Sequence, residues 1–185
     1  ILEQKKLVPE LPSVKLDKLI KKYKVGEKDA SVLAKDVDVV NFFEEVAKHI
    51  DGKFALPWIT VELLRVLNYN NKKLSDVSIA VEHFVKLLKM VDSEKITESQ
   101  AKQILNKFVP ASFDSTPHVE SKISSEKELE PIVKRVINDN SKAVLECRNG
   151  DIKAFNFLIG EVMRATNRRA DSAVTRKLID KALGK

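Results

Sequence analysis

The residue types that most often perform catalysis or bind metal ions are few in this chain and far apart. None of the three histidines stands at metal-ligand spacing from another histidine or from the single cysteine, Cys147. No glycine-rich phosphate loop occurs, and adjacent acidic residues on a helix point in different directions. We therefore expect no catalytic residue and no metal site, a buried or inert Cys147 thiol, and solvated side chains for His49, His83 and His118.

Positive charge is the feature that points to a binding function. The formal net charge of +6 lies entirely in residues 131–185, which have 12 basic and 6 acidic side chains, whereas residues 1–130 are neutral. Six of the seven arginines also fall in 131–185. Arginine's planar guanidinium suits phosphate, so this region predicts a polyanionic partner. The candidate contact residues are Arg148, Lys153, Arg164, Arg168, Arg169, Arg176 and Lys177.

One glycine in this basic region needs a separate explanation. Gly160 falls in the middle of a predicted helix, where glycine costs about 1 kcal/mol relative to alanine. Close packing against another helix is the favoured explanation, and close approach of a phosphate is the alternative. Because aromatic residues outside the apolar stripes are scarce, contact with the shape and phosphates of a folded RNA is favoured over base stacking.

The elements that would position these residues are helices. Apolar residues recur at three- and four-residue steps, as in Ile152, Phe155, Ile159, Val162 and Met163. With only five glycines and six prolines, the chain has little turn chemistry for β-hairpins. The spacing predicts an all-α protein with helices over 13–23, 27–35, 38–49, 57–70, 77–91, 98–108, 126–139, 141–148, 152–166 and 172–183.

Several helix starts carry capping signals. Two capping boxes are predicted, Thr97 with Gln100 and Ser125 with Glu128. Single N-caps are predicted at Asp151 and Asp171. Pro57 is expected in the first turn of the helix over 57–70.

Composition also predicts the domain organisation and excludes other classes. A polar, proline-bracketed segment over 110–118 divides the chain, which predicts a helical domain over 1–110, a linker over 111–119 and a second helical domain over 120–185. No apolar run approaches the roughly 20 residues that cross a bilayer, and no secretory signal begins the chain. One cysteine fits a reducing, cytoplasmic setting, and the initial Ile1 suggests a fragment of a longer protein.

Several segments resemble the B subunit of the aspartyl/glutamyl-tRNA(Asn/Gln) amidotransferase. They include Pro9-Glu10-Leu11-Pro12, Trp58-Ile59 with Glu62-Leu63, and above all residues 149–166, where Phe157-Leu158-Ile159-Gly160-Glu161-Val162-Met163-Arg164 is similar to that family's tail signature. Two positions depart from the family pattern. Pro57 stands where the family often has Asn, and the turn after the signature is basic rather than glycine-containing.

The resemblance implies a helical connecting domain followed by a small YqeY-like tail domain. It also implies tRNA as a partner, for Gln, Asn or both, together with the glutaminase (A) subunit of the amidotransferase and its small (C) subunit. ATP and Mg²⁺ would act in a catalytic domain upstream, with no cofactor in this chain. The alternative hypothesis is a helical adaptor that docks a partner protein without contacting RNA, and an autonomous small enzyme is the least supported.

Overall fold

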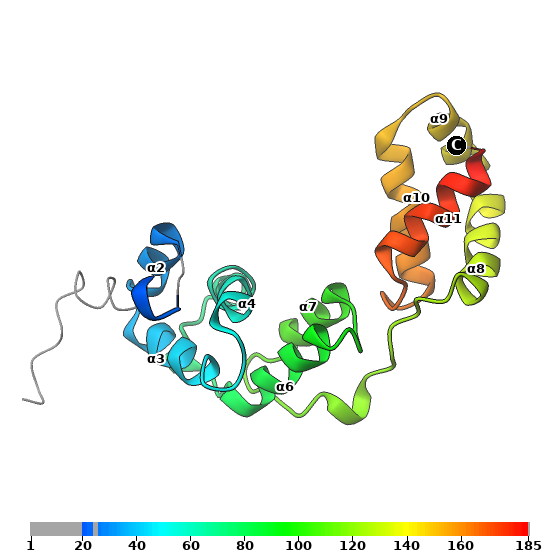
Figure 1. The fold of residues 1–185 in the computed structure, drawn as a ribbon. Coiled ribbons are helices and arrows are strands. Elements are labelled where there is room, and N and C mark those ends of the chain that lie inside the picture. The colour runs from blue at the N-terminus through cyan, green and yellow to red at the C-terminus, as the bar shows by residue number, and fades with distance from the viewer. Residues whose placement is uncertain (1–19, 24–25, 185) are drawn as a thin grey trace, which may run out of the picture. The chain divides into compact units, whose positions relative to one another are not determined.

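The computed structural model describes residues 20–23 and 26–184, and within them the regular secondary structure is helical (Figure 1). This part of the chain contains two isolated parallel β-bridges, Ser78 with Ala111 and Ile123 with Ala170, but no β-strand. The all-α prediction is therefore confirmed. Most of the predicted helix over 13–23, and Pro9-Glu10-Leu11-Pro12, lie outside the described residues, as does the side chain of His118.

The described residues form two compact units. Unit 1 comprises the residues up to Lys89 together with Leu105–Asp114, and unit 2 comprises Met90–Ile104 together with the residues from Ser115 onward. Helices α6 (Val81–Asp92) and α7 (Glu98–Asn106) each contribute residues to both units. The boundaries expected from composition, at 110 and 120, stay a prediction.

Unit 1 is built on short helices around an aromatic core. Its elements before α6 are α2 (Glu27–Leu33), α3 (Val37–Val46), α4 (Gly52–Pro57), the π-helical η2 (Trp58–Leu63), α5 (Leu64–Tyr69) and the 3-10 turn η3 (Leu74–Asp76). Phe43 and Phe84 are fully buried, and the Phe84 ring meets Phe42 edge-on at 5.3 Å between centroids. Such edge-to-face pairs contribute beyond the area that they bury.

Pro57 does not open a helix, contrary to the sequence prediction. Asp51 caps the helix by accepting from the amide of Lys53, and helical structure then continues from Gly52 to Tyr69. Proline has no N–H to donate to the preceding turn, and the backbone directly after Pro57 widens into η2. The Thr60 hydroxyl donates to the carbonyl of Leu56 at 3.0 Å, which satisfies a carbonyl in the disturbed turn.

Helix α6 begins four residues later than its apolar pattern predicts. Ser78 is held outside the helix because its amide donates to the carbonyl of Pro110 at 2.9 Å and its carbonyl accepts from the amide of Ser112 at 3.0 Å. The Ser112 hydroxyl also accepts from the amide of Ala80 at 2.8 Å, so it caps α6 from a distant segment. His83 Nδ1 lies 3.0 Å from this hydroxyl and the ring is half-buried, so its predicted solvation is wrong, whereas His49 is exposed.

Besides Met90–Ile104, unit 2 contains a four-helix cluster preceded by a short 3-10 turn, η4 (Thr116–His118). Its helices are α8 (Glu126–Asp139), α9 (Ser141–Arg148), α10 (Ile152–Ala165) and α11 (Ser172–Leu183), with bounds close to those predicted. Figure 1 shows α10 beside α11, with α8 and α9 packed against them. The buried core residues are Leu129, Val133, Val136, Val144, Cys147, Ala154, Phe155, Leu158, Val162, Ala170, Leu178, Ile179 and Leu183.

The buried face of α10 is rotated relative to the predicted stripe. Ile152 is 74% exposed, whereas Leu158 is fully buried, and the Cys147 thiol in the same core is buried too.

The Asp151 and Asp171 caps are confirmed, since both carboxylates accept two backbone amides of the following turn. The Thr97–Gln100 capping box is also confirmed, but Ser125 makes no side-chain cap. No described helix combines the length and the apolar character of a membrane span.

Candidate nucleic-acid interface

All seven predicted contact residues lie in unit 2, but not in one patch. Arg164 ends α10 and Arg168 lies in the turn that follows, and the two line the same hollow. Arg176 and Lys177 are neighbours on α11 and line a second, shallow hollow. The other three are Arg148 at the end of α9, Lys153 in the first turn of α10, and Arg169 beside Arg168.

The first hollow differs from the α11 hollow, whose lining includes Asp180, in the absence of acidic residues from its lining. It has a volume of about 460 Å³ and its lining includes no acidic residue; its lining residues are Gln103, Gly160, Met163, Arg164, Asn167 and Arg168. The Arg164 side chain is 78% exposed and forms an ion pair with Glu161, three residues earlier on the same helix. The Glu161 side chain is 18% exposed, so the pair is exposed on the arginine side only, where the guanidinium can also contact a phosphate.

Arg168 is held more firmly. Asn167 and Arg168 both have left-handed backbones, with φ of 50° and 62°. The amide of Arg168 donates to the carbonyl of Met163 at 2.7 Å, and its carbonyl accepts from the Thr97 hydroxyl at 2.6 Å. Its guanidinium donates to the Ser99 hydroxyl at 3.0 Å. Because a guanidinium has five N–H donors, this contact orients Arg168 and leaves donors for a ligand.

The favoured explanation for Gly160 is wrong. The residue is exposed, and a Cβ built on it would meet no described atom within 4 Å outside its own helix turn. Helix packing within the described part of the chain therefore does not require glycine at this position. The cost of glycine in a helix interior, about 1 kcal/mol, is left without a packing reason.

Arg169 differs from its neighbours because its charge is engaged within unit 2. Its side chain is 29% exposed, Nη1 lies 2.6 Å from a carboxylate oxygen of Glu120, and Nε donates to the carbonyl of Thr166 at 3.3 Å. These contacts hold the segment before α8 against the turn after α10. Arg169 remains a predicted contact residue, but its charge is already compensated.

The α11 pair is exposed but also has neighbours. The guanidinium carbon of Arg176 lies 5.2 Å from the centroid of the Phe155 ring, within cation–π range. Lys177 Nζ lies 2.6 Å from a carboxylate oxygen of Glu126, and both side chains are largely exposed. Solvent screening makes such a surface pair weak, so Lys177 is accessible to an anion.

Phe157 lies outside the apolar stripe predicted for α10. It is 49% exposed and lines a hollow of about 530 Å³ between α9 and α10, together with Lys142 and Lys153. Acidic residues Asp139 and Glu146 line the same hollow, so it is less favourable to phosphate than the hollow around Gly160.

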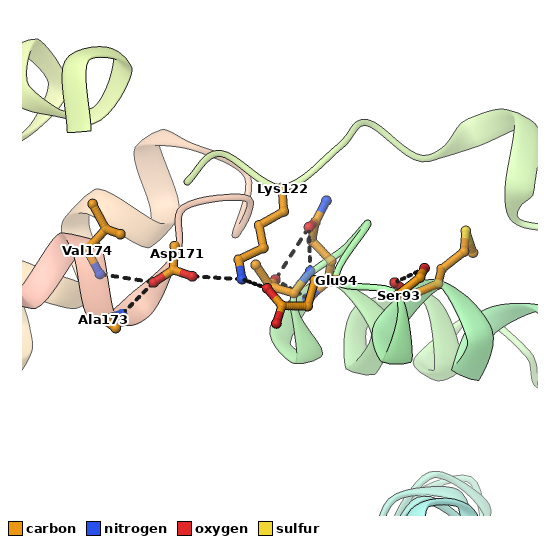
Figure 2. Close-up of polar contacts among 9 residues, drawn as sticks. Ser93, Glu94, Lys122, Asp171, Ala173 and Val174 are labelled. Carbon is orange, nitrogen blue, oxygen red and sulfur yellow. Dashed lines mark hydrogen bonds and ion pairs between the residues drawn. The ribbon is translucent and has the colours of Figure 1, made fainter. Parts of the chain in front are cut away.

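A half-buried lysine fixes the base of the turn that carries Arg168. Figure 2 shows Lys122 between Asp171 and Glu94, with its Nζ 2.7 Å and 3.2 Å from their carboxylate oxygens. The other Asp171 oxygen accepts from the amides of Ala173 and Val174 at the start of α11. Backbone hydrogen bonds between Ile123 and residues 169 and 171, each of 2.8 Å, complete the attachment.

These contacts shift two pKa values in opposite directions. The hydrogen bond from Lys122 and then the amide of Val174 hold the pKa of Asp171 below its usual value. The hydrogen bond to Asp171 raises the pKa of Lys122, against the opposing effect of its burial. Both side chains are less than 20% exposed, at 16% for Lys122 and 18% for Asp171, so the pair is screened less than a surface pair.

Replacing Asp171 with alanine should lower the free energy of unfolding of unit 2 by about 1–2 kcal/mol, the range for loss of an N-cap. Asp171→Ser retains a capping oxygen but loses the ion pair, so its loss should be smaller. Denaturation followed by circular dichroism measures both. An unchanged stability for Asp171→Ser would show that the Lys122 contact contributes nothing, and equal losses for the two variants would show that the capping oxygen contributes nothing.

The difference between wild type and Asp171→Ala should depend on pH. Because the folded-state pKa of Asp171 is lowered, its contribution is present above the ordinary carboxyl pKa of about 3.9 and is lost as the pH falls through the folded value. Because the pKa of Lys122 is raised, its contribution is lost only as the pH rises above about 10.4 and passes through the folded value. The difference should therefore be largest near neutral pH.

Helix α7 supplies contacts that the sequence did not indicate. Ser99 and Gln103 reach the turn after α10, and the Gln100 side chain donates to the carbonyl of Glu120 at 3.1 Å. These residues precede the linker predicted from composition and are far in sequence from the basic turn. They lie near it only because the chain folds back on itself. Only the Thr97–Gln100 capping box pointed to an ordered helix start there.

Among the described residues, no group of three His, Cys, Asp or Glu side chains gathers as a metal site. The chemistry that the described residues support is binding of an anion by arginine and lysine side chains.

Comparison with known proteins agrees with the helical fold and the tail signature. A family model described as the GatB domain matches residues 41–183. The B subunit of an aspartyl/glutamyl-tRNA(Asn/Gln) amidotransferase from Thermoanaerobacter sp. is 33% identical over 99% of this chain, one from Thermotoga petrophila is 36% identical over 98%, and one from Sulfurisphaera tokodaii is 36% identical over 100%. The chain spans about 40% of the length of these relatives. With most of its residues matched by the model, the chain belongs to the GatB domain family.

Proposed function

We propose that this chain is the tRNA-holding part of a tRNA-dependent amidotransferase, with no active site of its own among the described residues. The relatives are named as subunits of an enzyme that acts on tRNA for Asn and Gln. In that role the chain binds the body of Glu-tRNA(Gln) or Asp-tRNA(Asn) in the cytoplasm. Its partners are the glutaminase (A) subunit of the enzyme together with the small (C) subunit, whereas ATP and Mg²⁺ act at a site elsewhere in the enzyme.

The observation that supports RNA binding is the hollow lined by Arg164 and Arg168. Arg164 and Arg168 both line it, its lining includes no acidic residue, and Arg168 is oriented by Ser99. Contacts of this kind recognise the position of phosphates along the RNA backbone and do not distinguish the base sequence. Holding the tRNA body in place would raise the effective concentration of its aminoacylated end at a remote active site.

The experiment is a titration of the full chain with a labelled tRNA(Gln) transcript over a range of salt concentrations. The logarithm of the association constant should fall linearly with the logarithm of salt, with a slope of about −2 or steeper, because at least two phosphates are contacted. An RNA of the same composition that lacks the tRNA fold is the control and should bind more weakly.

The adaptor hypothesis gives a different result in the same experiment. An adaptor would show no salt-sensitive affinity for the transcript while still binding the glutaminase partner. That outcome, or equal affinity for the folded and unfolded RNA, would contradict a tRNA-holding role.

A further inference from the structure

The exposed glycine in α10 has neither a conformational nor a packing reason within the described chain. Gly160 has a helical backbone without a positive φ, so any residue can adopt its conformation. A Cβ at this position would point into open space. A glycine that leaves helix backbone bare at the surface permits another backbone to approach closely. The part that approaches therefore comes from outside the described residues.

The surroundings of Gly160 select an anionic backbone as the occupant. The hollow of about 460 Å³ presents the bare helix backbone between Arg164 and Arg168, with the amides of Gln103 and Asn167 also in its lining. Arginine forks match phosphate oxygens, and side-chain amides donate to phosphate or ribose oxygens. Met163 is the one apolar side chain in the lining.

The geometry of the turn fixes one side of this hollow before any ligand binds. Arg168 is anchored through its amide, its carbonyl and its guanidinium, by Met163, Thr97 and Ser99. Arg164 is 78% exposed and is held by an ion pair with Glu161 on its own helix. A ligand would thus meet one cation that is already oriented by three contacts, which lowers the cost of ordering.

We propose that a phosphodiester of the tRNA backbone lies against Gly160, between the guanidinium groups of Arg164 and Arg168. This inference rests on the proposed function and names the point of contact within it. The absence of a side chain at residue 160 is then a binding determinant, because any Cβ substituent would occupy the space of the phosphate or its ribose.

The test uses Gly160→Ala and Gly160→Leu in the full chain, titrated with the tRNA(Gln) transcript at fixed salt. Both substitutions should raise the melting temperature, by about 2–4 °C for alanine, because they replace an exposed helical glycine. Affinity should fall in the order Gly, Ala, Leu, with at least about a tenfold loss for leucine, the size expected when a charge-assisted hydrogen bond to phosphate is lost. A protein that is more stable yet binds more weakly has lost a contact, not its fold.

Ala165→Leu is the matched control, because Ala165 is exposed on the same helix outside the lining of the hollow. It should leave the affinity unchanged. An equal loss for Ala165→Leu and Gly160→Leu, or no loss for Gly160→Leu, would overturn the inference. If Gly160→Leu binds normally while removal of Arg164 and Arg168 weakens binding, the proposed function stands without this contact. If neither change has an effect, the proposed function fails as well.

Discussion

Truncating Leu158 to alanine is expected to lower the free energy of unfolding of unit 2 by about 2–5 kcal/mol, the range for buried leucine. Leu158 is fully buried on α10, in the core shared by α8, α9 and α11. Such a loss is a large part of the roughly 5–15 kcal/mol that stabilises a typical domain. Amide hydrogen exchange measured residue by residue should show faster exchange in α8–α11.

Leu145 provides the control for this prediction. It is 60% exposed on α9, so Leu145→Ala removes the same atoms from the surface and should change stability by no more than about 0.5 kcal/mol. Unit 1 has a separate core around Phe43, so exchange at its buried amides should change far less in Leu158→Ala. Equal effects of the two leucine substitutions would contradict the position of α10 in the core.

Removing both arginines of the hollow should weaken tRNA binding by about 10- to 100-fold at low salt, since each charge-assisted hydrogen bond contributes about 1.5–3 kcal/mol before screening. The variant is Arg164→Ala with Arg168→Ala. Both side chains are exposed, so the fold should persist, although loss of the Arg168–Ser99 contact can loosen the turn. Filter binding or fluorescence anisotropy with the tRNA(Gln) transcript measures the loss, and the melting temperature checks the fold.

The matched control removes two exposed lysines from unit 1. Lys48→Ala with Lys72→Ala lowers the net charge by the same amount, at residues outside the basic region. If net charge alone attracts the RNA, the two double variants will bind equally weakly. If a phosphate binds at the hollow, only the arginine variant should lose most of its affinity for the tRNA.

Local sequence signals predicted much of unit 2. Capping carboxylates at Asp151 and Asp171, together with Gly150 after α9, specify helix boundaries through interactions within a few residues. For this reason the bounds of α8, α9 and α11 match the prediction. The family resemblance in 149–166 rested on the same local pattern and was confirmed by the GatB domain match.

Tertiary interactions account for the features that the sequence did not indicate. The start of α6 is set by Ser112, more than thirty residues away in the chain, which no local pattern includes. The rotation of α10 that buries Leu158 and exposes Ile152 depends on which helices surround it. Arg169 looked equivalent to Arg168 in sequence, and only the contact with Glu120 separates them.

The candidate site shows the same limit. Charge clustering identified the arginines, but the hollow also depends on Gln103 and on the Ser99 contact, both from α7. Gly160 was noticed because glycine is costly in a helix, and periodicity placed it away from the apolar stripe, but the open space around it could not be derived from the sequence. Exposure is what changes the explanation from helix packing to a partner outside the chain.

The most direct test of RNA binding by this hollow is the salt dependence of tRNA(Gln) affinity for wild type and for the Arg164→Ala, Arg168→Ala variant. Each phosphate contact that is lost should reduce the slope of log K against log salt by about 1. Because both arginines contact the same phosphate in this account, a slope shallower by about 1 in the variant is the predicted result. Parallel lines for the two proteins would contradict phosphate contact at this hollow.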